Sequence, residues 1–408
     1  MKIGYAQAVI TPRIDPHRPA FLAGFERNRR AKAVHDDLWV RALALVQPGV
    51  GGAEPTCLVL AALDLIGFGR QRCLAVEARL QNACQALGLP VAQLLLACTH
   101  VHHAPDTIGF WGPDELTSGV DPDYLAFVEQ QCLETSLKAL QNLQPAAALR
   151  AAAVEVPGVA KNQRDPGIVD IELTCLQFSG AGGPLASVMI FPCHPEGVDP
   201  EGTTITSDYP HFLRAAVEAA TGAPCLFFSG ALGGMMSPDL PERSFAATER
   251  MGEQLAAAGL QALAGAESFE PWVRVRRRIF TTRLANPLFQ AAVQVGLLPD
   301  TANAAGEITT ETNLVQLGPA WLVSVPGELL PKLGLEIKAL LGRSGPCRFP
   351  AVIGLANDEL GYILPEAEYI YPDDPLDPQG HYEETMSVGP EIGTQLIQTV
   401  RAMLEAGT

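Results

Sequence analysis

The sequence alternates between short apolar runs and longer amphipathic segments. The apolar runs end abruptly at polar residues and predict buried strands, whereas segments with apolar residues every three or four positions predict helices. Expected strands cover residues 3–10, 38–46, 57–63, 149–156, 171–178, 186–192, 224–228, 272–283, 308–317, 320–325 and 352–356, together with the apolar run that begins at Leu94. Expected helices cover residues 71–87, 123–143, 209–220, 246–264 and 389–406, together with a segment that ends at Leu341.

This order of strands and helices indicates an α/β protein with part of its sheet parallel. We therefore expect a large mixed-sheet domain with helices on both faces. No internal repeat or low-complexity linker divides residues 1–408, so a single domain is predicted. Residues 284–305, between two predicted strands, are expected to form a lid or an insertion. In such folds, ligands collect at the carboxyl ends of strands, where Asp64 and His100 are expected to lie.

Composition narrows the range of partners. Hydrophobic residues make up 48% of the 408 residues, which is ample for a large core. The formal net charge of −17 argues against a nucleic-acid partner. No stretch of about 18 uncharged apolar residues occurs, so we expect no stable membrane association. A small molecule is the expected partner, and the oligomeric state stays open.

The cysteines indicate a reducing environment. There are nine of them, an odd number, scattered mainly in apolar contexts and without a C-x-x-C pair. This pattern is typical of reduced core thiols and argues against a structural zinc site built from cysteines. Residues 1–6 show no basic leader followed by an apolar stretch and a cleavage site. We therefore predict a cytoplasmic protein.

Three of the eight histidines follow the apolar run that begins at Leu94. Histidine is the commonest metal ligand and the side chain that titrates closest to neutral pH. If the strand continued through them, His100 and His102 would share one face and His103 would point away. A solvated, polar strand end is the alternative interpretation.

Further residues of metal-ligand type stand at the ends of other predicted strands: His194, Glu328 and Tyr362. Two or three imidazoles with one carboxylate form the ligand set of a catalytic zinc site that keeps an open position. Each residue also has an ordinary structural explanation. His194 can end a strand before Pro195, Glu328 can complement a helix dipole, and Tyr362 can be a core aromatic residue.

The order of motifs over essentially the whole chain resembles the catalytic domain of the neutral/alkaline, non-lysosomal ceramidases. Residues 99–105 resemble the family motif T-H-T-H-S-G-P, residues 191–195 resemble A-V-H-P, and residues 326–328 match P-G-E. Looser similarities occur at residues 4–12, 35–42, 162–164, 207–210, 234–238, 362–369 and 382–383. The resemblance implies a single ceramidase-like metallohydrolase domain.

The resemblance also implies roles for individual residues. It implies Zn²⁺ held by His100, His194, Glu328 and Tyr362, with His102 next to the metal as a proton-transfer residue; Arg164 and Tyr382 would line the site. Bound zinc supplies an acidified water, and His102, or in the alternative His103, would move the proton.

Several departures from the family pattern affect the expected substrate. His103 replaces a small residue, and Met235 and Met236 stand where the family has Asp-Val. No C-terminal immunoglobulin-like domain is expected. The favoured hypothesis is therefore a zinc-dependent amidohydrolase that cleaves the C–N bond of a linear or cyclic amide. A true ceramidase, which cleaves long-chain N-acyl sphingosine, and a non-catalytic metal-dependent binding protein are the alternatives.

Overall fold

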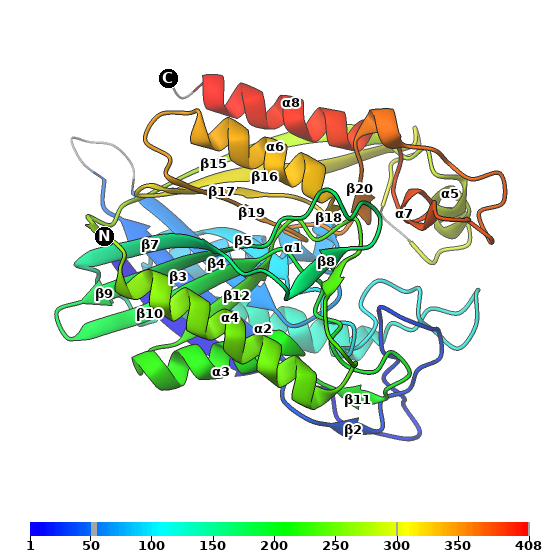
Figure 1. Ribbon diagram of the computed structural model, residues 1–408, viewed down its shortest axis with the longest axis horizontal. Coiled ribbons are helices and arrows are strands. Elements are labelled where there is room, and N and C mark those ends of the chain that lie inside the picture. Colours follow the sequence, from blue (N-terminus) through cyan, green and yellow to red (C-terminus); the bar gives the residue numbers. More distant parts are fainter. Residues whose placement is uncertain (50–54, 299–300, 407–408) are drawn as a thin grey trace.

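Three β-sheets form the centre of the molecule. The computed structural model describes residues 1–49, 55–298 and 301–406 (Figure 1). The first sheet has the strand order β5 (Gln93–Cys98), β4 (Thr56–Leu63), β3 (Trp39–Gln47), β1 (Lys2–Val9), β6 (Gln144–Pro145). The second has the order β12 (Cys225–Ser229), β10 (Gly183–Phe191), β9 (Glu172–Gly180), β7 (Ala148–Glu155), β14 (Ser268–Phe269). The third has the order β15 (Val273–Arg283), β16 (Glu307–Leu317), β17 (Ala320–Ser324), β19 (Phe349–Ile353).

Helices cover the outer faces of these sheets. In Figure 1, α6 (Pro331–Gly342) and α8 (Glu391–Glu405) lie above the third sheet, and α3 (Tyr209–Thr221) and α4 (Phe245–Ala264) lie on the opposite side of the molecule. Helices α1 (Arg70–Leu87) and α2 (Pro122–Gln141) pack together and against the first sheet. The predicted α/β fold with helices on both faces is therefore confirmed.

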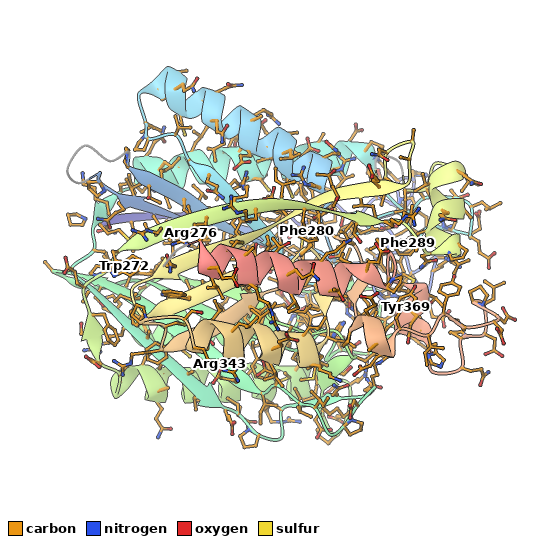
Figure 2. All side chains as sticks on the ribbon, turned by 90° about the horizontal axis from the view of Figure 1, so that it is seen from above. Trp272, Arg276, Phe280, Phe289, Arg343 and Tyr369 are labelled. Atoms are coloured by element: carbon orange, nitrogen blue, oxygen red, sulfur yellow. The ribbon has the colours of Figure 1, made fainter. Side chains whose placement is uncertain are left out.

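The inner faces of the three sheets share one apolar core. Leu60 of the first sheet, Phe178 of the second and Ile353 of the third belong to the same buried cluster. Separate clusters join the outer faces of the sheets to the helices, and α8 lies along β15 of the third sheet (Figure 2). Apolar contact on both sides explains why the central strands are nearly continuous hydrophobic runs in the sequence.

Parallel strand pairs bring several strand ends to one edge of the molecule. The parallel neighbours are β4 with β5, β10 with β12 and β17 with β19. A fourth parallel pair joins two short strands, β18 (Glu328–Leu329) and β20 (Tyr362–Ile363). Two further short pairs are β8 (Ala160–Asn162) with β13 (Met236–Pro238) and β2 (Ala33–Val34) with β11 (Thr204–Ile205).

The structure corrects one sequence expectation and adds helices that the sequence did not predict. The strand expected at 352–356 is β19, which begins and ends three residues earlier because it pairs with β17 from Phe349 to Ile353. The chain then turns at Leu355, whose φ is 51°. Residues 284–305 contain the unpredicted helix α5 (Pro287–Gln294), where Asn286 accepts hydrogen bonds from the first backbone N–H groups. Two shorter helical turns, η1 (Glu366–Glu368) and α7 (Tyr382–Thr385), precede α8.

The structure also shows where the cysteines lie and how apolar the helices are. All nine cysteines are buried with free thiols, as expected of core residues. Among the helices in the described ranges, none is long and apolar enough to cross a membrane.

Asp64, expected at the ligand-collecting edge, is instead part of a buried ion pair. Its two carboxylate oxygens each lie 2.8 Å from a guanidinium nitrogen of Arg214 in α3. The backbone N–H of Trp39 also donates to Asp64, at 3.0 Å. Both charged side chains are almost completely excluded from solvent. The pair therefore ties α3 to the end of β4 and leaves Asp64 unavailable as a ligand.

We expect Arg214→Leu to lower the free energy of unfolding by about 3–5 kcal/mol, because it leaves the Asp64 carboxylate buried without its partner. Chemical denaturation monitored by circular dichroism measures this loss. The matched control is Arg401→Leu, which removes an exposed pair with Glu336 and should cost no more than about 1 kcal/mol. The double variant Asp64→Leu/Arg214→Leu should be more stable than Arg214→Leu alone. Equal losses in Arg214→Leu and Arg401→Leu would contradict this account.

Candidate metal centre and active site

His100, His102 and His103 lie in a turn rather than on a strand. Strand β5 ends at Cys98, and His100 has a φ of 66° in the left-handed region. Strand alternation therefore does not set the directions of these side chains, and that part of the sequence argument is wrong. The outcome for His103 nevertheless agrees with the expectation. Its Nε2 lies 3.1 Å from the backbone oxygen of Asp199, away from the cluster formed by the other two.

Three buried imidazoles meet at this turn. His194 follows β10, and its ring centroid lies 5.0 Å from that of His100 and 5.5 Å from that of His102. The centroids of His100 and His102 are 5.1 Å apart. One nitrogen from each ring lies within 4.8 Å of the others, so the three could hold a metal ion.

Backbone carbonyls fix which ring nitrogen of His100 and of His194 points to the centre of the site. The Nδ1 of His100 lies 2.7 Å from the oxygen of Ile66, and the Nδ1 of His194 lies 3.0 Å from the oxygen of Met236. A carbonyl oxygen only accepts, so each Nδ1 carries the proton. In the neutral imidazole, Nε2 then carries a lone pair and no proton. This arrangement is typical of metal-ligating histidines, whose other nitrogen donates to an oxygen of the protein.

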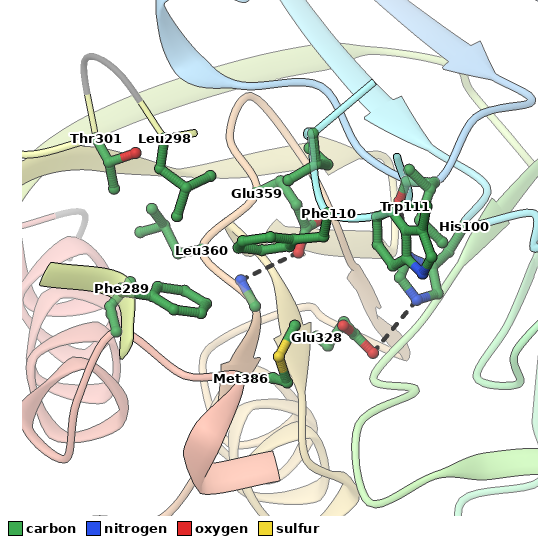
Figure 3. A pocket seen from close by; sticks show the side chains of 14 residues that line it. His100, Phe110, Trp111, Phe289, Leu298, Thr301, Glu328, Glu359, Leu360 and Met386 are labelled. Carbon is green, nitrogen blue, oxygen red and sulfur yellow. Dashed lines mark hydrogen bonds and ion pairs between the residues drawn. The ribbon is translucent and has the colours of Figure 1, made fainter. Parts of the chain in front are cut away.

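Glu328 places a carboxylate oxygen between the Nε2 atoms of His100 and His194. Its Oε2 lies 3.3 Å from Nε2 of His100 (Figure 3) and 3.0 Å from Nε2 of His194. Burial alone would raise the pKa of Glu328, but His100 and His194 lower it overall. Burial alone would lower the pKa of His194, but Glu328 raises it overall. A proton on Nε2, or a metal ion held by both imidazoles, would therefore balance the buried carboxylate. The distances also suit ligands of one ion, because tetrahedral zinc ligands stand about 3.3 Å apart.

Tyr362 completes the set of four residues that the resemblance implies as ligands. It pairs directly with Glu328 across the short parallel strands β18 and β20. Its hydroxyl donates to Sδ of Met235 at 3.1 Å. Burial, and then the Glu328 carboxylate, raise the pKa of this phenol well above its ordinary value. The structure thus brings His100, His194, Glu328 and Tyr362 into one buried centre.

His102 is the least satisfied member of the cluster. Both of its ring nitrogens are buried, and neither has a hydrogen-bond partner among the described residues. Its Nδ1 is 3.6 Å from Oε2 of Glu196. The ring packs directly over Gly24, where an added Cβ would lie 2.3 Å from the imidazole. Burial and the neighbouring histidines lower the pKa of His102 well below its usual value. The free nitrogens suit either proton transfer or a third nitrogen ligand.

Arg164 and Tyr382 both lie near the centre, but Arg164 is engaged by carboxylates and Tyr382 is partly exposed. The guanidinium of Arg164 makes two bonds to Glu384, of 2.8 and 3.0 Å, and one of 2.8 Å to Glu383. It therefore holds α7 in place and has little capacity left for a substrate. Tyr382 begins α7, and its ring centroid is 6.1 Å from that of Tyr362. Since Tyr382 is 46% exposed, it lies at the rim of the site.

Sequence reasoning missed several acidic residues of this site. Glu196 beside His102, and Glu383 and Glu384 around Arg164, were not predicted as site residues. Their available signals were weak: Glu196 is two residues after His194, and Glu383 and Glu384 follow Tyr382 directly.

A small cavity of about 60 Å³ adjoins the centre (Figure 3). His100 and Glu328 form part of its wall, and most of the rest is apolar. Three lining residues come from the region expected to be a lid or an insertion: Phe289, Leu298 and Thr301. The wall also includes Ile108, Phe110, Trp111, Glu359, Leu360 and Met386.

The fold and the site together define a mixed α/β protein with a buried centre of metal-ligand type. No protein-family model matches the sequence, and no curated protein matches it. Solved structures do match. The neutral ceramidase from Pseudomonas aeruginosa superposes with a TM-score of 0.79 at 18% identity, covering 99% of this chain and 74% of that one. A ceramidase complexed with C2 gives a TM-score of 0.78 at 17% identity, covering 99% and 75%. This chain therefore has the fold of these ceramidases, as the motif order predicted.

We expect the purified protein to bind one divalent metal ion per chain, measured by elemental analysis after dialysis against a buffered metal supply. His194→Ala removes an Nε2 from the centre and should weaken binding by more than about 100-fold, since even residues that merely orient ligands change affinity 10–100-fold. His103→Ala is the matched control, because it removes a neighbouring imidazole outside the cluster and should retain the metal. Equal metal content in both variants would contradict the assignment.

Proposed function

We propose that this chain is a zinc-dependent hydrolase that cleaves the C–N bond of a small or medium amide in the cytoplasm. The observation that carries the proposal is the approach of the Nε2 atoms of His100 and His194 to one oxygen of Glu328, while a backbone oxygen engages the Nδ1 of each ring. The likeness in fold to ceramidases supports amide hydrolysis, because a ceramidase cleaves an amide. The nine buried free thiols support a reducing compartment.

His100, His194, Glu328 and Tyr362 would hold the zinc, which when bound supplies an acidified water and polarises a carbonyl oxygen. The remaining steps fall to the residues around the centre. One free nitrogen of His102 accepts the proton that the attacking water loses and later delivers it to the leaving amine. Tyr382, at the rim, is placed to orient the substrate carbonyl. Arg164 acts through α7, since its bonds to Glu383 and Glu384 fix the helix that carries Tyr382.

The size of the cavity favours a short substrate segment. The cavity of about 60 Å³ beside the centre has room for only a few water molecules, so only a short segment fits there. A longer chain would have to extend into the neighbouring groove of about 750 Å³. The second candidate, a true ceramidase, is favoured by the likeness to the neutral ceramidase from Pseudomonas aeruginosa. It would require a deeper apolar channel, for which residues 284–305 would have to move as a lid.

A panel of N-acyl amides tests the proposal. The metal-loaded protein should hydrolyse amides with short acyl groups, the metal-free protein should not, and activity should return with zinc. Full activity after complete metal removal would refute metal dependence. Faster turnover of long-chain than of short-chain substrates would favour the ceramidase. Tightly bound zinc without turnover of any amide or ester would favour the non-catalytic alternative.

His102→Gln should lower kcat on a short-chain amide by about 10²–10⁴-fold, the usual contribution of a general acid–base group. The metal content should stay at the wild-type level, because the four ligands remain. Steady-state kinetics and elemental analysis on the same sample separate the two roles of His102. Loss of the metal would show that His102 is a ligand rather than the proton carrier.

A further inference from the structure

Glu359 is an acidic residue in the cavity that the proposed mechanism does not use. It lies between β19 and β20, three residues before Tyr362. Figure 3 shows its side chain on the cavity wall, on the same cavity as His100 and Glu328. It also borders a larger neighbouring groove of about 750 Å³. Glu359 is therefore placed where a substrate bound at the centre could reach it.

One oxygen of this carboxylate lacks a partner. Oε1 accepts a hydrogen bond of 3.1 Å from the backbone N–H of Gly361. Oε2 is buried and has no hydrogen-bond partner among the described residues. The adjacent Asp358 differs, because its oxygens accept from the backbone of Arg70 and Glu359 and from the hydroxyl of Thr310, at 2.8 to 3.1 Å. The free oxygen is thus specific to Glu359 and not a general property of this acidic segment.

The side chain has little freedom to find a partner elsewhere. Its Cγ packs over Gly67 so closely that an added Cβ there would lie 2.6 Å away. The hydrogen bond to Gly361 holds the other end. The carboxylate is therefore fixed at the cavity wall in the position where a ligand would meet it.

The residues around Glu359 indicate which kind of ligand would bind there. The cavity lining includes Ile108, Phe110, Phe289, Leu298 and Leu360, and no lysine or arginine occurs among its described residues. A buried polar atom without a hydrogen bond is unfavourable, and a buried carboxylate more so. Burial and the Glu328 carboxylate raise the pKa of Glu359 well above its ordinary value, so its ionised form needs a cationic partner. A ligand with an apolar segment that ends in a cationic N–H donor would satisfy both the walls and the carboxylate.

We propose that Glu359 determines specificity by binding a protonated primary amine, carried on a short apolar segment of the amide substrate. The substrate class is accordingly an amide with an amino group a few carbons from the scissile bond. This inference rests on the proposed amide hydrolysis at the same centre, but the binding step can be measured without turnover.

The first experiment compares the binding of n-butylamine and n-butanol to the metal-loaded protein at pH 7 by isothermal titration calorimetry. The wild type should bind the amine, which is protonated at this pH, at least about tenfold more tightly, as expected for a hydrogen bond to a charged group. Glu359→Gln, which keeps the shape of the side chain, should abolish the preference. Glu270→Gln, which removes the same charge outside the cavity, should retain it. Thermal melting confirms that each variant is folded. Equal affinity for both ligands, or a preference that persists in Glu359→Gln, would overturn the inference.

The second experiment compares hydrolysis of two acetamides of equal length, one ending in an amine and the other in a methyl group. The wild type should favour the amine in kcat/KM by at least about tenfold, and Glu359→Gln should not. Hydrolysis without this preference would overturn the role of Glu359 and leave the proposed function intact. An amine-binding preference that depends on Glu359, without hydrolysis of either amide, would support the role of Glu359 and count against the proposed function.

Discussion

The site depends on one electrostatic constraint: two imidazole nitrogens and a carboxylate oxygen are held together in a buried place. The backbone oxygens of Ile66 and Met236 accept hydrogen bonds from the Nδ1 atoms of His100 and His194, so both Nε2 atoms face Glu328. They lie 3.3 and 3.0 Å from its Oε2, and a buried carboxylate needs positive charge at this point. A bound metal ion would supply that charge, so ion binding and the stability of this region should be coupled.

The fold builds this centre from backbone features that few residues tolerate. His100 adopts a left-handed φ of 66° two residues after β5, and its ring centroid lies 5.0 Å from that of His194, which follows β10 of the second sheet. Gly361 has a φ of 70°, and a Cβ at this position would lie 1.9 Å from the backbone oxygen of Met386. This close approach lets β20 pair with β18, which sets Tyr362 opposite Glu328. The large sheets therefore support the site. The short strands β18 and β20 and the left-handed conformations of His100 and Gly361 determine where the candidate ligands lie.

The sequence was most informative where periodicity reflects burial. Apolar strands such as β4 and β10 were predicted within a few residues, because contact with apolar layers on both faces leaves a continuous hydrophobic run. Residue type and position at strand ends were enough to select His100, His194 and Glu328. Local pattern could not show that Asp64 is neutralised by Arg214, or that Arg164 is engaged by Glu383 and Glu384, since those partners are 150, 219 and 220 positions away. It also misjudged the histidine turn, because a left-handed φ at a non-glycine residue leaves no periodic signal.

Buried ionisable groups in this protein are either fully paired or partly unpaired, and the two kinds have different roles. Asp64 and Arg214 satisfy each other completely, so their interaction fixes the fold and leaves no capacity for binding. His102 and Glu359 retain buried atoms without partners, and each such atom costs about 1–3 kcal/mol of stability. His102 lies in the histidine cluster, and Glu359 lines the small cavity that adjoins it beside Glu328. At these two positions a bound ligand could supply the missing hydrogen bonds and charge, which no ligand could do for a polar atom enclosed in the core.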